Sequence, residues 1–279
     1  MKATTQSPAL VLFLVDGSHS TGVSWITDAK QGTEESIAAT LETAVNRALH
    51  DLVVNCCYQE SEIRNRISLG LYVAQGDSVS WSIGEETPVD GWMPSDQWAI
   101  LATQDGGSPR WFTLEPRGKT PLLKGWKHMY AILSEFYAAF PQSSAMLITL
   151  TDGSFNELNF DKETTEELVE LQHSTVGERS FVHLLAHISA DGDDPLVFPI
   201  ERPAGEVSSM LFDLSTPLPS HMFKGNQNPH LGGVSISPES KSYIHNADPV
   251  LLSDMIQLGS RVVDGNGPRP LPVPVNEEE

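Results

Sequence analysis

The stretch LVLFLVDGSHS, residues 10–20, decides both the expected fold and the expected site. Its apolar run, Val11–Val15, is typical of a strand that is buried on both faces of a sheet. The polarity then changes abruptly, and Asp16, Ser18 and Ser20 place three oxygen-bearing side chains on alternate positions. Because alternate side chains of an extended chain point to the same side, these three are expected to cluster. Ligands of open α/β sheets bind outside the carboxyl ends of the strands, so the stretch predicts a ligand site there.

Length and composition indicate one large domain. The chain has 279 residues, which is enough to bury a sizeable core. Apolar residues make up 39% of it, and no apolar run reaches the length of a membrane span. The first apolar run ends in Asp16 and not in a small-residue cleavage site, which favours a strand over a signal peptide. We therefore expect a cytoplasmic protein.

The charge balance restricts the class of partner. Lys and Arg number 17 and Asp and Glu number 37, which gives a formal net charge of −20. Nucleic acids and anionic membranes both select a positive surface, so neither is expected as a partner. The acidity fits divalent cations, basic partners or simply solubility.

Periodicity predicts strands alternating with helices along the chain. Strands are expected over 67–75, 78–83, 145–150 and 181–188, and helices over 33–52, 121–140, 162–172 and 249–258. Residues 21–32 are expected to form a loop or an irregular first turn, and 207–214 fits a strand or a helix equally well. Alternation of this kind predicts a doubly wound α/β fold, with a mostly parallel central sheet and helices on both faces. Gly76-Asp77 is a hairpin signal, which adds one antiparallel edge strand.

The expected domain organisation is a single domain over residues 1–263 followed by a proline-rich acidic tail over 264–279. The tail is interpreted as a disordered end, with a partner-docking polyproline segment as the alternative. Loop elaborations are expected over 189–245. A long excursion over 84–119 contains Trp92, Trp98 and Trp111. We expect it to pack these rings onto the domain, and a peptide-binding aromatic groove is the alternative.

Three segments of the predicted fold converge on one edge of the sheet. Asp16, Ser18 and Ser20 follow the first strand, and Asp152 follows a later central strand in the sequence LTDG. Thr120, in RGKTP, lies just before a helix that leads into that later strand. Parallel strands end at the same edge, and a helix that precedes a strand begins at that edge. The topology therefore predicts that five oxygen-bearing side chains meet.

These residues resemble the von Willebrand factor A-type (vWA) domain and its metal-ion-dependent adhesion site (MIDAS). That site consists of Asp-x-Ser-x-Ser, a distant Thr and a distant Asp, and the chain shows DGSHS, GKT and TDG in this order. The resemblance covers at least Leu10–Ile188, and the excursion and late loops depart from the family pattern. It implies that Ser18, Ser20 and Thr120 bind the metal directly, while Asp16 and Asp152 act largely through water. The alternative is that these side chains only cap helices and turns.

The donor set and the resemblance together predict the ligand. Five oxygen donors without sulfur select a hard cation, so Mg²⁺ is expected, with Mn²⁺ and Ca²⁺ as alternatives. In the resembled family an Asp or Glu of a protein partner completes the coordination of the metal. Stand-alone bacterial members suggest an adaptor beside a kinase, a phosphatase or an AAA-type ATPase. The expected rim of the site, which would contact the partner, consists of His19, Trp25, Ser154 and Asn156.

The expected function is therefore a non-enzymatic, metal-dependent protein-interaction module. One alternative is a metal-assisted phosphohydrolase with Asp16 as its nucleophile. Such enzymes place a second Asp two residues later as the general acid, and this chain has Ser18 there. A structural domain with a vestigial metal site is the other alternative.

Overall fold

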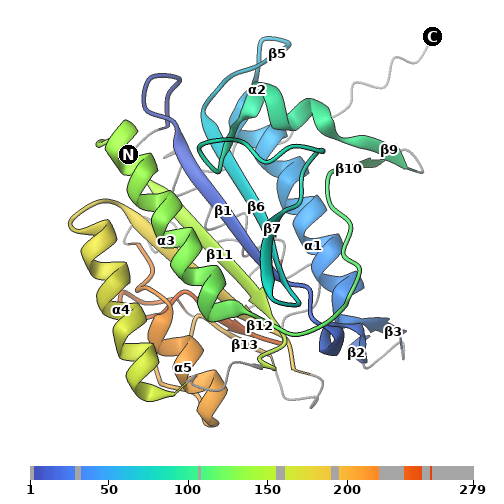
Figure 1. Cartoon of the computed structure of the whole chain (residues 1–279), viewed down its shortest axis with the longest axis vertical. Helices are drawn as coiled ribbons and strands as arrows, with labels where there is room; N and C mark the ends of the chain where they lie inside the picture. The colour runs from blue at the N-terminus through green and yellow to red at the C-terminus, as the bar shows by residue number, and fades with distance from the viewer. Residues whose placement is uncertain are drawn as a thin grey trace.

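The computed structural model describes residues 3–28, 33–105, 108–154, 161–189, 195–219, 236–246 and 252. Its central sheet has the strand order β13-β14-β12-β11-β1-β6-β7, and five of these strands are parallel (Figure 1). The parallel strands are β1 (Ala9–Asp16), β6 (Ile67–Gln75), β11 (Ala145–Thr151), β12 (Phe181–His187) and β14 (Tyr243–His245). The mostly parallel α/β fold expected from the sequence is confirmed.

Antiparallel strands close the sheet at both edges. The expected edge strand, β7 (Ser78–Trp81), forms a hairpin with β6, and β8 (Met93–Pro94) also pairs with β6. At the other edge, β13 (Leu196–Val197) pairs antiparallel with β14. The expected antiparallel edge strand is therefore confirmed, and the structure adds two short antiparallel strands, β8 and β13. The sequence did not indicate β13, because it lies in a turn-rich acidic loop that shows no period-two signal.

The first strand lies at the centre of the molecule, and all eight of its residues are buried. Val11, Phe13 and Val15 pack on the side of the sheet covered by α1 (Ile37–Leu52). Leu10, Leu12 and Leu14 pack on the opposite side, which is the side of α3 (Leu122–Ala139). This double burial explains the uninterrupted apolar run of the sequence.

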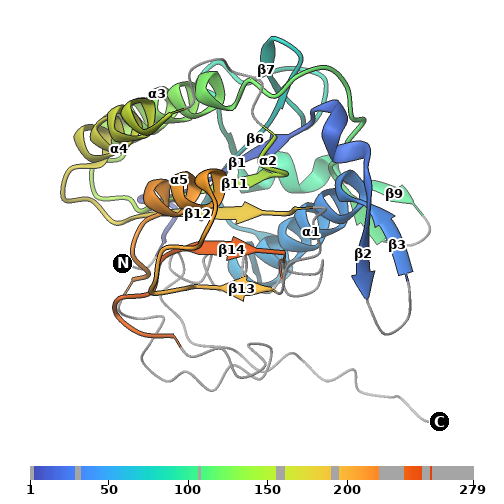
Figure 2. The same cartoon turned by 90° about the horizontal axis from the view of Figure 1, so that it is seen from below.

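Helices cover both faces of the sheet, as expected. On the side of α3 lie also α4 (Lys162–Val176) and α5 (Glu206–Leu214), while α1 covers the other side (Figures 1 and 2). The segment over 207–214, for which the sequence favoured neither state, is thus a helix. Within the described residues, no helix has the length and apolarity required to cross a membrane.

The first helix begins later than the sequence suggested. Residues 33–36 form β3 (Thr33–Ser36), which pairs with β2 (Ser24–Asp28) in a hairpin that projects from the body of the sheet (Figure 2). The side chain of Ser36 accepts a hydrogen bond of 3.1 Å from Ala39 N and caps α1. The expected helix start at residue 33 was therefore wrong. Of the segment over 21–32, residues 24–28 form a strand and not the expected loop or irregular turn. The expected final helix over 249–258 lies outside the described residues, apart from Leu252.

The excursion over 84–119 packs against the domain through its tryptophans. Trp98 and Trp111 are buried and meet edge to face, with ring centroids 6.1 Å apart. Trp92 meets Phe136 of α3 in the same way at 5.3 Å. The expected packing is confirmed. The short elements of the excursion are β8, α2 (Ser95–Trp98), η3 (Ala99–Leu101), β9 (Thr103–Asp105) and β10 (Ser108–Arg110).

Candidate functional site

The register of the two central strands places Asp16 beside Thr151. Strands β1 and β11 are parallel, and Val15 lies opposite Leu150, so the next residue of each strand reaches the carboxyl edge together. Both Asp16 and Thr151 are fully buried. The Thr151 hydroxyl donates a hydrogen bond of 2.8 Å to Asp16 Oδ2. The site therefore starts from a carboxylate that is fixed between two strand ends.

The other oxygen of Asp16 accepts two further hydrogen bonds. The backbone N–H of Ser18 donates to Oδ1 at 2.9 Å, and the Thr120 hydroxyl donates to the same oxygen at 3.3 Å. Thr120 is itself fully buried, at the entry to α3. These contacts confirm the expected convergence of the first strand end with Thr120.

The two serines of the motif lie side by side. Ser18 Oγ and Ser20 Oγ are 2.9 Å apart; Ser18 is fully buried and Ser20 is half-buried. A further hydrogen bond stabilises this turn, because the Thr21 hydroxyl donates to Ser18 O at 2.8 Å. Residues 19–22 form the 3-10 helix η1 (His19–Gly22), which carries Ser20 at the start of its turn. The two hydroxyls meet as the sequence predicted, although a 3-10 turn and not an extended chain brings them together.

Backbone hydrogen bonds hold the segment over 117–120 against the motif. Arg117 N donates to Gly17 O at 2.9 Å, and His19 N donates to Gly118 O at 3.0 Å. Gly76 N, in the β6–β7 turn, donates to Lys119 O at 2.9 Å. The long excursion therefore returns to the sheet edge and delivers Thr120 through a segment that is tied on both sides.

Gln75, at the end of β6, is a positioning residue that the sequence interpretation missed. Its Nε2 donates to Gly17 O at 2.9 Å, and its Oε1 accepts from Arg117 Nε at 2.9 Å. The side chain therefore connects the motif to the segment that carries Thr120. A polar residue at the end of a buried strand, next to the predicted site edge, was the available signal. Thr151 was overlooked similarly, although it belongs to the TDG motif.

Asp152 lies one residue beyond Thr151 and is half-buried. Its Oδ1 accepts a hydrogen bond of 2.8 Å from Ser154 N, which closes a tight turn. Gly153 has φ +74°, and a Cβ on it would lie 2.4 Å from His187 Nε2. Glycine is thus required at this point for both conformation and space.

The two carboxylates influence one another. Burial, and then the nearby charge of Asp152, raise the pKa of Asp16 to about 7. Hydrogen bonds from Ser18 and Thr151 act in the opposite direction and do not fully compensate. No cationic side chain is among the groups that set this pKa. The site therefore combines two carboxylates with hydroxyl groups and retains unneutralised negative charge.

The expected rim is described in part. His19 and Ser154 are both exposed beside the cluster. The backbone of Trp25 pairs with Glu35 in the β2–β3 hairpin. Asn156 lies outside the described residues. The role of these residues toward a partner stays a prediction.

The cluster differs in composition from metal sites built on carboxylates, imidazoles and thiolates. Within the described ranges, no three His, Cys, Asp or Glu side chains come together as a metal-ligand group. The site at the sheet edge instead has three hydroxyls, on Ser18, Ser20 and Thr120, beside two carboxylates. Such a donor set suits a hard cation that keeps part of its water shell.

No protein-family model matches the chain, and no curated protein matches it. Among solved structures, similarity is found to the PilB minor pilin from Streptococcus sanguinis, with 14% identity and a TM-score of 0.46. The match covers 94% of this chain and 64% of the pilin, so the chain spans less than two thirds of that protein. An aerotolerance-related membrane protein from Bacteroides fragilis is 12% identical with a TM-score of 0.33, over 71% of this chain and 76% of that one. The human COPII-coat protein Sec24c is 9% identical with a TM-score of 0.32, over 67% of this chain and 27% of that one. At these values, the interpretation of the site depends on the residues of this chain.

Proposed function

We propose that the chain is a non-enzymatic protein-interaction module that binds an acidic residue of a partner protein through a divalent cation, with Mg²⁺ the expected ion. The observation that carries the proposal is the hydrogen-bonded cluster at the carboxyl edge of the sheet. Ser18, Thr120 and Thr151 all donate to the buried carboxylate of Asp16. Ser20 Oγ lies 2.9 Å from Ser18 Oγ, and the charge of Asp152 acts on Asp16, which supports one site for the five motif residues.

The residues present fit a hard cation. Ser18 Oγ and Ser20 Oγ lie close enough to serve one ion, and the Thr120 hydroxyl donates to the same Asp16 oxygen as the backbone N–H of Ser18. Oxygen ligands are those that Mg²⁺ prefers, and Mn²⁺ or Ca²⁺ would also be accepted. A bound cation would also neutralise the charge that raises the pKa of Asp16.

The hydroxyl ligands explain why a partner carboxylate would bind. Ser and Thr hydroxyls are neutral, so they leave much of the charge of the ion uncompensated. An Asp or Glu of a partner would supply the missing charge, while the exposed His19 and Ser154 lie beside it. A kinase, a phosphatase or an AAA-type ATPase remains the proposed class of partner, and the cytoplasm the proposed compartment.

The environment of Asp16 supports binding over catalysis. Its side chain is fully buried, and both oxygens already accept hydrogen bonds. A nucleophilic carboxylate needs an accessible oxygen and a general acid nearby, and Ser18 stands where a second Asp would serve that role. These features favour a structural and electrostatic role for Asp16.

The test is isothermal titration of chelator-treated protein with Mg²⁺, Mn²⁺ and Ca²⁺, paired with thermal unfolding. The native chain is expected to bind one ion saturably and to unfold at a higher temperature when it is bound. Thr120→Ala is expected to abolish both effects. Thr113→Ala is the matched control, because Thr113 is an exposed residue of the same segment. Metal binding that survives in Thr120→Ala would refute the proposed site.

A second experiment separates interaction from catalysis. Partners captured from a lysate in Mg²⁺ are expected to be released by chelator and to be missed by Thr120→Ala. Phosphoester hydrolysis that depends on Mg²⁺ and disappears in Asp16→Asn would instead establish the enzyme alternative.

A further inference from the structure

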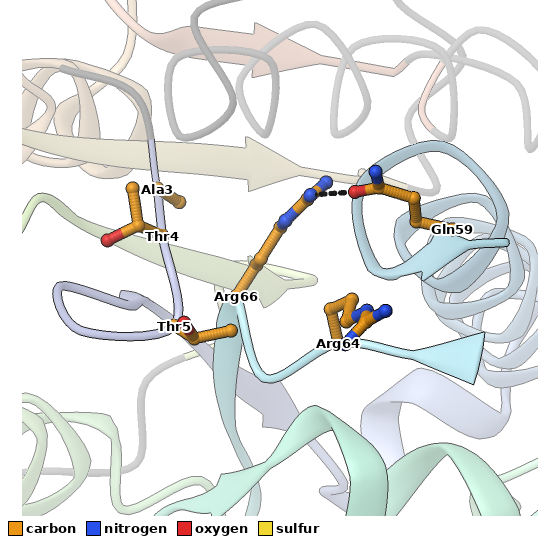
Figure 3. A pocket seen from close by; sticks show the side chains of 6 residues that line it. All are labelled: Ala3, Thr4, Thr5, Gln59, Arg64 and Arg66. Carbon is orange, nitrogen blue, oxygen red and sulfur yellow. Dashed lines mark hydrogen bonds between the residues drawn. The ribbon is translucent and has the colours of Figure 1, made fainter.

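A pocket of about 320 Å³ opens at the amino-terminal edge of the sheet, at the opposite end of β1 and β6 from the Asp16 cluster. It is lined by Ala3, Thr4, Thr5, Gln59, Arg64 and Arg66 (Figure 3). None of the six is acidic, although acidic residues outnumber basic ones by 37 to 17 in the whole chain. We propose that this pocket binds a phosphate group, either free or carried by a small phosphomonoester.

Arg66 is the centre of the pocket. Its side chain lies between the N-terminal segment and Gln59 (Figure 3). Its Nη2 donates to Gln59 Oε1, and its Nη1 donates to Cys56 O at 3.4 Å. Both acceptors are neutral, and no carboxylate of the described residues forms an ion pair with Arg66. A half-buried guanidinium with only neutral partners keeps its charge available for an anion.

Gln59 adds a second kind of donor. Because its Oε1 accepts from Arg66, the amide NH₂ is the part of Gln59 that remains to donate. Gln59 is held in place by the hairpin of β4 (Tyr58–Gln59) and β5 (Glu62–Ile63). The hairpin thus presents a neutral donor beside the cationic group.

The N-terminal segment forms the opposite wall. Ser7 N donates to the Thr4 hydroxyl oxygen at 3.0 Å, and Thr4 N donates to Ser7 O at 3.0 Å, which closes a turn. Ala9 N donates to Arg66 O at 2.9 Å and fixes this turn next to Arg66. Thr5, in the middle of the turn, is exposed and brings its hydroxyl to the wall.

Arg64 has a secondary role. Its Nη2 lies 3.0 Å from Glu62 Oε2 and 3.9 Å from Glu60 Oε2, so its charge is partly compensated. The pocket is therefore rich in donors, with one guanidinium that pairs with no carboxylate of the described ranges and a second close by. Guanidinium groups match the geometry of phosphate oxygens, and two of them suit a dianion. The volume exceeds the needs of a single ion, which leaves room for the organic part of a small monoester.

The test uses the metal-free full chain, titrated with inorganic phosphate and with glycerol 3-phosphate in chloride buffer of constant ionic strength. Binding is followed by calorimetry. Saturable binding of either probe, weakened at least tenfold in Arg66→Gln, is the expected result. Lys127→Gln is the matched control, since it removes one positive charge from an exposed position of α3 and is expected to bind as the native chain does. Phosphate binding alone would identify a free-anion site, and binding of both would identify a monoester site.

A second variant keeps the test valid if Arg66→Gln unfolds. Thr5→Glu places a carboxylate on an exposed position of the wall, leaves the contacts of Arg66 intact, and is expected to weaken binding by a similar factor. Lack of saturable binding by the native chain, or an equal loss in Lys127→Gln, would overturn the proposal. Because no metal is present, this outcome is independent of the cation site.

Discussion

The hydroxyl of Thr151 donates a 2.8 Å hydrogen bond to Asp16 Oδ2 across two neighbouring parallel strands. The same hydroxyl oxygen accepts from Gly153 N at 3.0 Å. Thr151 therefore connects the first carboxylate of the site to the turn that carries the second one, Asp152. Through this contact, the position of Asp16 and the position of the turn at Asp152 depend on each other.

Replacing Thr151 by valine tests this dependence. The variant keeps the shape of the side chain but leaves Asp16 Oδ2 buried without its donor, which costs about 1 to 3 kcal/mol. The free energy of unfolding is expected to fall by that amount, and Mg²⁺ affinity is expected to fall with it. Both are measured by denaturant titration and calorimetry. Thr165→Val is the control, because the buried Thr165 donates only to Asp161 O of its own helix entry. Equal metal affinity in Thr151→Val would refute the coupling.

Asp16→Asn separates stability from metal binding. Without metal, the native Asp16 places a buried charge next to Asp152, and this raises its pKa to about 7. Asparagine removes that charge, so the metal-free variant is expected to be more stable at pH 8 by roughly 1 to 3 kcal/mol. Its stabilisation by Mg²⁺ is expected to disappear. Thermal unfolding with and without Mg²⁺ measures both effects, and Asp77→Asn, in the exposed β6–β7 turn, is the control. A variant less stable than the native chain without metal would contradict this account.

Gly118 and Gly76 form a matched pair for testing the segment that carries Thr120. Both have positive φ, +68° and +64°, but their surroundings differ. A Cβ on Gly118 would lie 2.8 Å from the Cα of Gly76, while a Cβ on Gly76 has no atom within 4 Å. The free energy of unfolding of Gly76→Ala is expected to fall by about 1 kcal/mol, because alanine is strained at a positive φ. The free energy of unfolding of Gly118→Ala is expected to fall by about 3 kcal/mol, because the backbone at Gly118 must also move away from that at Gly76.

The consequence for metal binding distinguishes the two glycine variants further. Displacing Gly118 shifts the backbone that leads to Thr120, so Gly118→Ala is expected to bind Mg²⁺ at least tenfold more weakly. Gly76→Ala is expected to bind almost normally. Calorimetric titration of both proteins checks this, and equal affinities would show that the segment does not position Thr120.

Much of the fold and site followed from the sequence because the signals were local. The buried run of β1 and the DGSHS spacing fixed a strand end, and parallel topology then brought Thr120 to it. The start of α1 was missed because Thr33 and Ser36 both suit a helix cap, and only pairing with β2 decides between them. This pairing is local, since Ser36 lies opposite Ser24 and Thr33 opposite Asp28, but the cap preferences of residues 33–36 do not record it.

The roles of Gln75, Thr151 and Arg66 could not be predicted for a related reason. Gln75 and Thr151 act on groups that only the folded sheet brings close, and Arg66 acts on groups that the β4–β5 hairpin and the turn before it place beside it. A polar residue at a strand end indicates a possible site residue, but its role depends on the group with which it forms a hydrogen bond. The β13 edge strand was missed because two residues are too few to show a period.

A buried polar network behind the site involves His183. His183 Nδ1 lies 3.1 Å from Gln172 Oε1, and Nε2 lies 3.0 Å from Thr149 Oγ1. Trp126 Nε1 donates to Thr149 Oγ1, and the Tyr130 hydroxyl donates to Gln172 Oε1, each at 3.1 Å. A neutral imidazole with its proton on Nδ1 satisfies all four contacts. His183 of β12 is therefore a buried residue of the core.

This network predicts a loss of stability in mild acid. Burial lowers the pKa of His183 to about 3, against 6.5 for an ordinary histidine. Between these values the unfolded chain binds a proton that the folded chain does not, so stability is complete above pH 6.5 and decreases as the pH falls. One proton corresponds to about 1.4 kcal/mol per pH unit, hence about 2 kcal/mol between pH 7 and pH 5. Denaturant titrations at both values measure this. His183→Gln is expected to be less stable at pH 7 but to lose about 2 kcal/mol less than the native chain on acidification, whereas the exposed His173→Gln is expected to follow the native chain. A pH dependence of His183→Gln identical to that of the native chain would show that the protonation of another group sets the acid sensitivity.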